Sequence, residues 1–252
     1  MAMPNIDEIL PGSRSGLDRE ALAELYGRPG AARGAGPWIR VNFVATADGS
    51  ATGDDDRSGT ISSEADMAVF GVLRRLADVV LVAAGTVRRE GYEGPLVREA
   101  QRAWRLEHGL AEHPGFAIVS ERLDLDPDSA LFAESPVRPL VLTYASSPAD
   151  RHAALAEVAD IAFVGEDALD RAALRDAFAE RGWSDVLCEG GPTFFGSLAH
   201  ADAVDELCLT VVPKLVAGDG PRIAHGRETD VALRLAHVLH GPADELILRY
   251  TR

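Results

Sequence analysis

A carboxylate, two glycines and a proline follow an apolar run near the C-terminal third of this sequence, at Glu189, Gly190, Gly191 and Pro192. The run itself, residues 185–188, reads as a strand, and a proline at this point is typical of the first position of a helix. A strand, a glycine turn and a helix start together present free backbone N–H groups and the positive end of a helix dipole, which can bind a pyrophosphate. On this stretch alone, an ordinary tight turn without a ligand remains the simpler interpretation.

A second strand end of the same kind lies earlier in the chain. Residues 78–84 form a buried apolar run that continues through Gly85 and Thr86 into a short helical stretch with two arginines. Ligands of open α/β sheets bind at the carboxyl ends of the strands, so two such turns predict a nucleotide-sized site. Neither turn carries G-x-G-x-x-G or G-x-x-x-x-G-K-[ST], the usual dinucleotide and triphosphate motifs.

Alternating strand and helix patterns surround both turns. Runs rich in β-branched and aromatic residues predict strands at 38–46, 78–84, 115–120, 138–145, 160–165 and 185–188. Helical spacing of apolar residues predicts helices at 17–27, 64–77, 149–159, 169–182 and 192–201, whereas 88–113 reads as irregular. Three further strands, at 204–218, 230–241 and 244–250, follow without helices between them. This order predicts one α/β domain whose sheet is parallel in its centre and antiparallel at one end.

Two details of these elements bear on the site and on assembly. In the helix at 64–77, which Ser62 or Ser63 can cap, the spacing places four apolar residues on one face: Met67, Phe70, Leu73 and Leu76. The final strands have no obvious covering helix. An uncovered apolar edge or face of a protein usually packs against another chain, so we expect a homodimer. Residues 28–37, rich in Gly, Ala and Pro, read as a flexible lead-in.

Composition excludes several classes of protein. The 252 residues carry 25 Lys and Arg against 40 Asp and Glu, a formal net charge of −15 that repels nucleic acid and anionic membranes. No run approaches the roughly 18 apolar residues of a membrane span, and the N-terminus lacks a signal-peptide pattern, so we expect a cytoplasmic protein. Cys188 and Cys208 lie in apolar runs and read as buried thiols. The carboxylates at 54–56 and the histidines lack ligand spacing, so we expect no metal.

Three segments, residues 41–53, 61–87 and 186–218, resemble in order and spacing the pyrimidine reductase domain of riboflavin biosynthesis. This domain is a member of the dihydrofolate reductase-like superfamily. The resemblance covers roughly residues 37 to 251, and its most specific part is the block from EGGPT to DEL. It divides the chain into an N-terminal extension, residues 1–36, and a reductase domain, residues 37–252.

The resemblance implies both a fold and an activity. The fold is a three-layer, dihydrofolate reductase-like α/β structure with a mostly parallel central sheet, antiparallel C-terminal strands and flanking helices, and the family typically forms homodimers. The activity is the NADPH-dependent reduction of the ribosyl group of an aminopyrimidine phosphate to a ribityl group, most like that of 5-amino-6-(5-phosphoribosylamino)uracil reductase. The cofactor carries the hydride, and the protein supplies positioning, a dry site and a proton route.

The resemblance also implies site residues, although it assigns no catalytic residue. Those matching cofactor-binding positions, or lying in the two turns that carry them, are Val44, Thr60, Gly85, Thr86, Glu90, Ser120, Gly190, Gly191, Pro192, Thr193, Phe194, Phe195, Gly196 and Ser197. Those on the substrate side are Asn42, Ser58, Arg74 and Glu189. Within the first set, the stretch from Gly191 through Ser197 would wrap the pyrophosphate. Arg122, close to Ser120, could meet a 2′-phosphate by its charge.

The chain departs from the family pattern on the substrate side. Asn42 stands where the family has lysine, Thr60 where it has tryptophan, and residues 90–101 replace its D-x-P-x-L-T-x-R loop. Neither H-x-E nor P-C-x-x-C of a zinc deaminase occurs, so a riboflavin role would be the reductase step alone. Two alternatives stay open: a reductase of a pterin or folate, and a nucleotide-binding protein that has kept the cofactor site without the chemistry.

Overall fold

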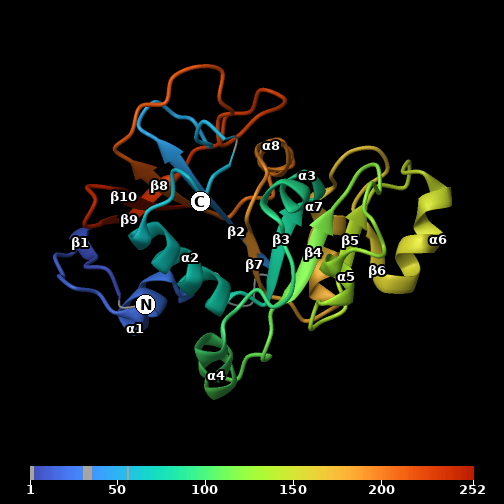
Figure 1. The fold of residues 1–252 in the computed structure, drawn as a ribbon, viewed down its shortest axis with the longest axis horizontal. Helices are drawn as coiled ribbons and strands as arrows, with labels where there is room; N and C mark the ends of the chain where they lie inside the picture. Colours follow the sequence, from blue (N-terminus) through green and yellow to red (C-terminus); the bar gives the residue numbers. More distant parts are fainter. Residues whose placement is uncertain (1–2, 31–35, 56) are drawn as a thin grey trace.

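The computed structural model describes residues 3–30, 36–55 and 57–252. Its strands are β1 (Asp7–Leu10), β2 (Trp38–Thr46), β3 (Val79–Ala83), β4 (Gly115–Val119), β5 (Leu140–Thr143), β6 (Asp160–Phe163), β7 (Asp185–Cys188), β8 (Glu206–Val212), β9 (Arg234–His240) and β10 (Leu246–Thr251). They form one sheet in the spatial order β1-β9-β10-β8-β2-β7-β3-β4-β5-β6 (Figure 1). The first and last strands of the described chain, β1 and β10, therefore belong to the same sheet.

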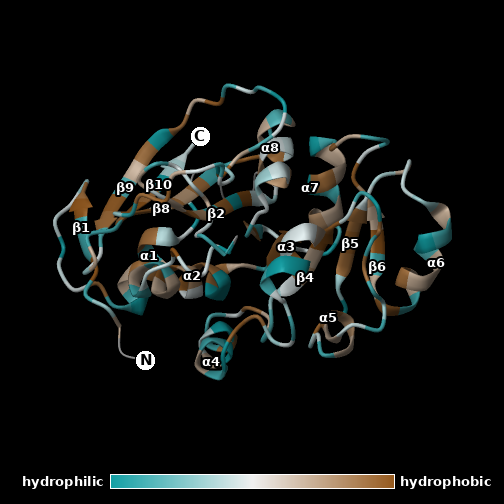
Figure 2. Ribbon diagram, turned by 45° about the horizontal axis from the view of Figure 1, so that its top comes forward, coloured by the Kyte–Doolittle hydropathy of each residue, from teal (hydrophilic) through white to brown (hydrophobic). Residues whose placement is uncertain are grey.

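Strand direction divides the sheet into two halves. From β8 through β2, β7, β3, β4 and β5 to β6, every neighbouring pair is parallel, whereas β10 is antiparallel to β8 and β9, and β1 is antiparallel to β9. The central parallel strands are apolar along their whole length because helices cover both of their faces, as Figure 2 shows by hydropathy. The predicted α/β fold class, with its antiparallel C-terminal strands, is confirmed.

The helices form the two outer layers of this fold. They are α1 (Arg19–Tyr26), α2 (Glu64–Leu76), α3 (Ala84–Glu90), α4 (Glu99–Glu107), α5 (Ala130–Ala133), α6 (Ala149–Val158), α7 (Arg171–Ala179) and α8 (Pro192–His200). Apolar side chains of α1 and α2 form one core cluster with β7 to β10, and those of α7 and α8 form another with the central strands. Cys188 and Cys208 are buried and unpaired, as predicted.

The structure corrects three details of the sequence-based prediction. Residues 88–113, expected to be irregular, contain α4, and the chain before β2 contributes the edge strand β1. On α2 the buried face is formed by Ala65, Val69, Val72 and Leu73, while Met67 is 52% exposed. Helical spacing allows several apolar stripes, and the stripe containing Met67 and Phe70 faces a cleft rather than the core.

The segment that precedes β2 packs into the same core as the rest of the chain. Ile6, Leu22 and Tyr26 are fully buried, and β1 pairs with β9. The flexible lead-in predicted at 28–37 falls mostly outside the described residues, since 31–35 are not described.

A buried ionic cluster joins α1 to the antiparallel half of the sheet. Glu206, with no exposed surface, accepts from Arg40 Nε at 2.5 Å and from Arg249 Nη2 at 2.8 Å. The two guanidiniums also donate to backbone carbonyls at the end of α1, Arg40 to Tyr26 and Arg249 to Leu25. Burial alone would raise the pKa of Glu206, but the two arginines outweigh it and lower this pKa to about 2.

Candidate active site

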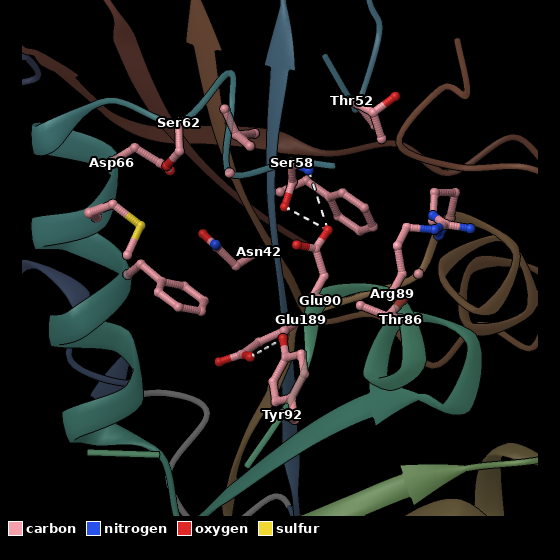
Figure 3. A pocket seen from close by; sticks show the side chains of 18 residues that line it. Asn42, Thr52, Ser58, Ser62, Asp66, Thr86, Arg89, Glu90, Tyr92 and Glu189 are labelled. Atoms are coloured by element: carbon pink, nitrogen blue, oxygen red, sulfur yellow. Dashed lines mark hydrogen bonds between the residues drawn. The ribbon is translucent and has the colours of Figure 1, made fainter. Parts of the chain in front are cut away.

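A cleft opens where β2, α2, α3 and the turn between β7 and α8 meet (Figure 3). The turn is positioned by β7, which lies between β2 and β3 in the sheet. Since β3 leads directly into α3, the carboxyl ends of two adjacent parallel strands deliver their following turns to the same place. The cleft therefore occupies the position at which open α/β sheets bind ligands.

The two glycine-containing turns predicted from the sequence lie side by side. Gly191 is the N-cap of α8, with Pro192 at its first position, and a Cβ added to Gly191 would lie 2.7 Å from Thr86 Oγ1. Gly190 has φ of +96°, and a Cβ there would lie 3.0 Å from the ring of Phe43. Backbone N–H groups at the start of α8 thus border the cleft beside a hydroxyl, a combination that suits an anion.

The floor of the cleft holds an immobilised carboxylate. Glu189, whose side chain is 2% exposed, accepts from Arg74 Nε at 2.6 Å and from Arg74 Nη2 at 2.8 Å. The Tyr92 hydroxyl donates to Glu189 Oε2 at 2.7 Å, and the Tyr92 ring stacks on Phe116. Burial and, next, the Glu189 charge raise the pKa of Tyr92, which keeps its hydroxyl a donor. Glu189 is therefore an acceptor held in one orientation.

Across the cleft from α2, a second carboxylate meets the loop after β2. Glu90 Oε1 accepts from both the backbone N–H and the hydroxyl of Ser58, each at 3.3 Å. Together with the residues above, the predicted site residues that line the cleft are Asn42, Val44, Ser58, Thr86, Glu90, Glu189, Gly191 and Pro192. The structure thus brings together residues that lie up to 150 positions apart in the sequence, from Asn42 to Pro192.

Other predicted residues occupy different surroundings. Thr60 is exposed and donates to Asp55 Oδ1 at 2.8 Å, and Ser120 is buried at the end of β4. Ser197 donates to the Thr193 carbonyl, and the remaining predicted residue of α3, Gly85, is exposed. Arg74 reaches the cleft through its pair with Glu189 and also lines a neighbouring groove along α2.

Three predicted cofactor residues in α8 serve packing. Phe194 and Phe195 are 6% and 7% exposed, and the Phe195 ring stacks on Phe43 with centroids 5.4 Å apart. A Cβ on Gly196 would lie 2.1 Å from the His225 carbonyl oxygen, so a close approach of backbone explains the glycine. Contacts from this part of α8 to a cofactor would come from its backbone.

Several residues that line the cleft were missed from the sequence, among them Asp66, Tyr92 and Thr52. Asp66, on the first turn of α2, is 6% exposed and accepts from the Ser62 hydroxyl. Tyr92 follows α3, in the segment read as irregular, and Thr52 has a buried hydroxyl with no hydrogen-bond partner in the described part of the chain. An acid near a helix start is usually a surface residue that favours the helix dipole, so the sequence offered no signal that Asp66 is buried.

The cleft suits a nicotinamide cofactor in the chemistry of its walls. The glycine turn offers backbone donors without a side chain in front of them, and the orphaned Thr52 hydroxyl offers one further polar group.

Among the described residues, no three His, Cys, Asp or Glu side chains are grouped so that they could hold a metal ion. Of the described helices, none is long and apolar enough to cross a membrane.

Comparisons with known proteins assign most of this chain to one family. The family model of the RibD C-terminal domain matches residues 37–247. The 2,5-diamino-6-ribosylamino-4(3H)-pyrimidinone 5′-phosphate reductase of Archaeoglobus fulgidus is 27% identical over 191 residues, which cover 75% of this chain and 87% of that protein. The protein of the same name from Methanothermobacter thermautotrophicus is 25% identical over 227 residues, covering 85% of this chain and 98% of its own.

A solved structure shares the fold. The crystal structure of a pyrimidine reductase-like protein from Corynebacterium diphtheriae superposes with a TM-score of 0.77 at 23% identity, covering 91% of this chain and 97% of that one.

Proposed function

Because the chain belongs to the RibD C-terminal domain family, we propose that it is a reductase of riboflavin biosynthesis that uses NADPH to reduce the ribosyl group of an aminopyrimidine 5′-phosphate. The observation that carries the proposal is the meeting of the two glycine turns above an immobilised Glu189. The glycine turns suit the phosphates of a dinucleotide, and the Glu189 carboxylate suits the N–H groups of a heterocycle. The homologous reductases named above act on such a pyrimidine.

The proposed roles follow from the positions of the side chains. The N–H groups at the start of α8 and the Thr86 hydroxyl bind the pyrophosphate of NADPH, whose nicotinamide supplies the hydride. Arg74 and Tyr92 orient Glu189 toward the pyrimidine, and Ser58 holds Glu90 at the opposite wall. Fixing both partners in one cleft removes much of the entropic cost of bringing them together. We place these roles in a reductase domain, residues 37–252, which the N-terminal extension completes by packing, and in the cytoplasm.

The activity is tested by following the loss of NADPH absorbance. We expect turnover with the ribosylaminopyrimidine 5′-phosphate and none with dihydrofolate. Turnover of dihydrofolate instead would make the protein a pterin or folate reductase. Tight NADPH binding without turnover of either would leave a nucleotide-binding protein and reject the proposal.

A preference for NADPH over NADH is expected to depend on Arg122. This residue is exposed two positions after Ser120, at the carboxyl end of β4. A charge-assisted bond from its guanidinium to the 2′-phosphate is worth on the order of 1.5–3 kcal/mol, or roughly tenfold to a hundredfold in affinity. In titrations, the affinity of Arg122→Ala for NADPH should fall by this factor, while its affinity for NADH should stay that of the wild type. Equal dissociation constants of the wild type for the two cofactors would contradict the prediction.

We also expect a homodimer formed through the antiparallel strands. On one face of β8, β9 and β10 the side chains are mainly apolar and only partly covered, with Leu235 45% and Leu246 38% exposed. Leu246 lies opposite Val211, and Leu248 opposite Leu209, so this face is continuous. Light scattering should give a mass of two 26.8 kDa chains for the wild type and of one for Leu246→Asp. Leu106→Asp, on α4, is the control that should stay dimeric, and a monomeric wild type at micromolar concentration would exclude the dimer.

A further inference from the structure

The three carboxyl groups that line the cleft differ in what surrounds them. Glu189 is paired with Arg74, and Glu90 accepts from Ser58 near the rim. Asp66 is buried, and among the described residues its side chain has two hydroxyl partners, Ser62 and Thr210. The charged side chain that acts on Asp66 is another carboxylate, Glu245. Asp66 is thus a buried carboxyl of this cleft that has no cationic partner among the described residues.

The position of Asp66 makes it available to a ligand. It projects from α2 into the wall of the cleft, where Figure 3 shows it beside Ser62 and across from Ser58 and Glu90. A carboxylate has about four acceptor positions, and two hydroxyls leave about two of them unused. Met67 and Phe70, on the same helix, line the cleft with apolar surface on which a flat ring can lie. Burial raises the pKa of Asp66, and N–H donors from a ligand would favour its charged form.

We propose that Asp66 selects the base of the substrate, accepting hydrogen bonds from the ring N–H and the 2-amino group of a 2-aminopyrimidin-4-one and rejecting the corresponding uracil. This inference rests on the proposed reductase function. A 2-aminopyrimidin-4-one offers two adjacent donors, which match the two oxygens of a carboxylate. Uracil replaces the amino group with a carbonyl oxygen, which would face a carboxylate oxygen with no proton between them.

The base that Asp66 selects places the reaction before a deamination. Reduction of the sugar leaves the 2-amino group on the product. To become the 2-oxo compound, that product must next meet a hydrolytic deaminase, in which water adds to C2, the C2–N bond breaks and ammonia leaves. This chain would therefore supply a deaminase rather than receive its product.

The test compares the two bases in steady-state kinetics with NADPH. The substrates are 2,5-diamino-6-ribosylamino-4(3H)-pyrimidinone 5′-phosphate and 5-amino-6-ribosylaminouracil 5′-phosphate. For the wild type we expect kcat/KM to favour the first by about a hundredfold or more. Asp66→Asn should narrow or reverse this ratio, because a carboxamide can donate to the 2-oxo group while it accepts from the ring N–H. Asp66→Glu keeps the charge and should keep the direction of the preference.

Two further measurements separate selection from a structural role. Ser63→Ala removes the N-cap of the same helix, so it should lower the Tm and leave the substrate ratio unchanged. Calorimetric binding of 2,6-diaminopyrimidin-4-one and 6-aminouracil should show the same preference without turnover. A wild type that uses both phosphates equally, or an Asp66→Asn variant that loses both equally, overturns the role of Asp66 and leaves the reductase function intact. Absence of NADPH oxidation with either substrate rejects the reductase function itself.

Discussion

Replacement of Gly191 by aspartate is expected to weaken NADPH binding about a thousandfold. Gly191 caps α8 at the edge of the cleft, beside Thr86. If its neighbouring N–H groups bind the pyrophosphate, the new carboxylate stands next to two phosphate charges. Two unit charges about 4 Å apart repel by about 4 kcal/mol at an effective dielectric constant near 20, which corresponds to close to a thousandfold in affinity.

The measurement is a fluorescence titration with NADPH, together with thermal unfolding of the variant without cofactor. Gly191 has φ of −81°, which any residue can adopt, so a Cβ there requires only a shift of the Thr86 side chain. Gly190→Ala is the matched control: its φ of +96° and the contact with Phe43 predict a loss of folding stability instead. A folded Gly191→Asp variant that binds NADPH as tightly as the wild type would show that the turn has no cofactor role.

Glu206→Ala is expected to lower the free energy of unfolding by about 3–5 kcal/mol. The substitution leaves Arg40 and Arg249, 6% and 5% exposed, as two buried cations without their shared carboxylate. Asp160→Ala, which breaks an exposed pair with Arg138, should change the stability by about 1 kcal/mol or less. Urea denaturation at neutral pH measures both, and equal small effects would mean that the buried cluster contributes little.

The buried cluster of Glu206, Arg40 and Arg249 also predicts how the difference in stability between the wild type and Glu206→Ala depends on pH. The pKa of Glu206 is lowered from 4.5 to about 2 in the folded protein, so its contribution is complete above 4.5 and is lost as the pH falls toward 2. The gap in stability between the wild type and Glu206→Ala should therefore narrow over that interval. A gap that stays constant from neutral pH down to pH 2 would contradict the assignment of the low pKa to Glu206.

Most of the sheet could be predicted from the sequence because its strands are buried on both faces. Strands such as β3 read as unbroken apolar runs between turn residues, and the absence of helices after residue 204 predicted the antiparallel end. Strand β1 could not be found, since its four residues alternate weakly and depend on pairing with β9, more than 200 positions later. Helix α4 was missed because its exposed surface is mainly polar and its one buried residue is Arg105.

The candidate site was predictable where backbone geometry defines it. Glycines at two strand ends indicated the two turns, and the parallel order of the strands brought them together. Side-chain partnerships across the cleft were not predictable, because Tyr92 and Asp66 acquire their environment only when α2 and the segment after α3 pack against β7 and β8. The sequence shows that a polar side chain can form hydrogen bonds, but the tertiary fold determines which groups become its partners.

The place of β2 in the sheet has a consequence for the protein during its synthesis. Both neighbours of β2 in the sheet, β7 and β8, begin at residues 185 and 206, so β2 leaves the ribosome long before either exists. At about 5–20 residues per second, β2 would wait on the order of 10–30 s for its first partner. During that interval β2 is an apolar segment with two unpaired edges, which is the kind of surface through which incomplete chains associate.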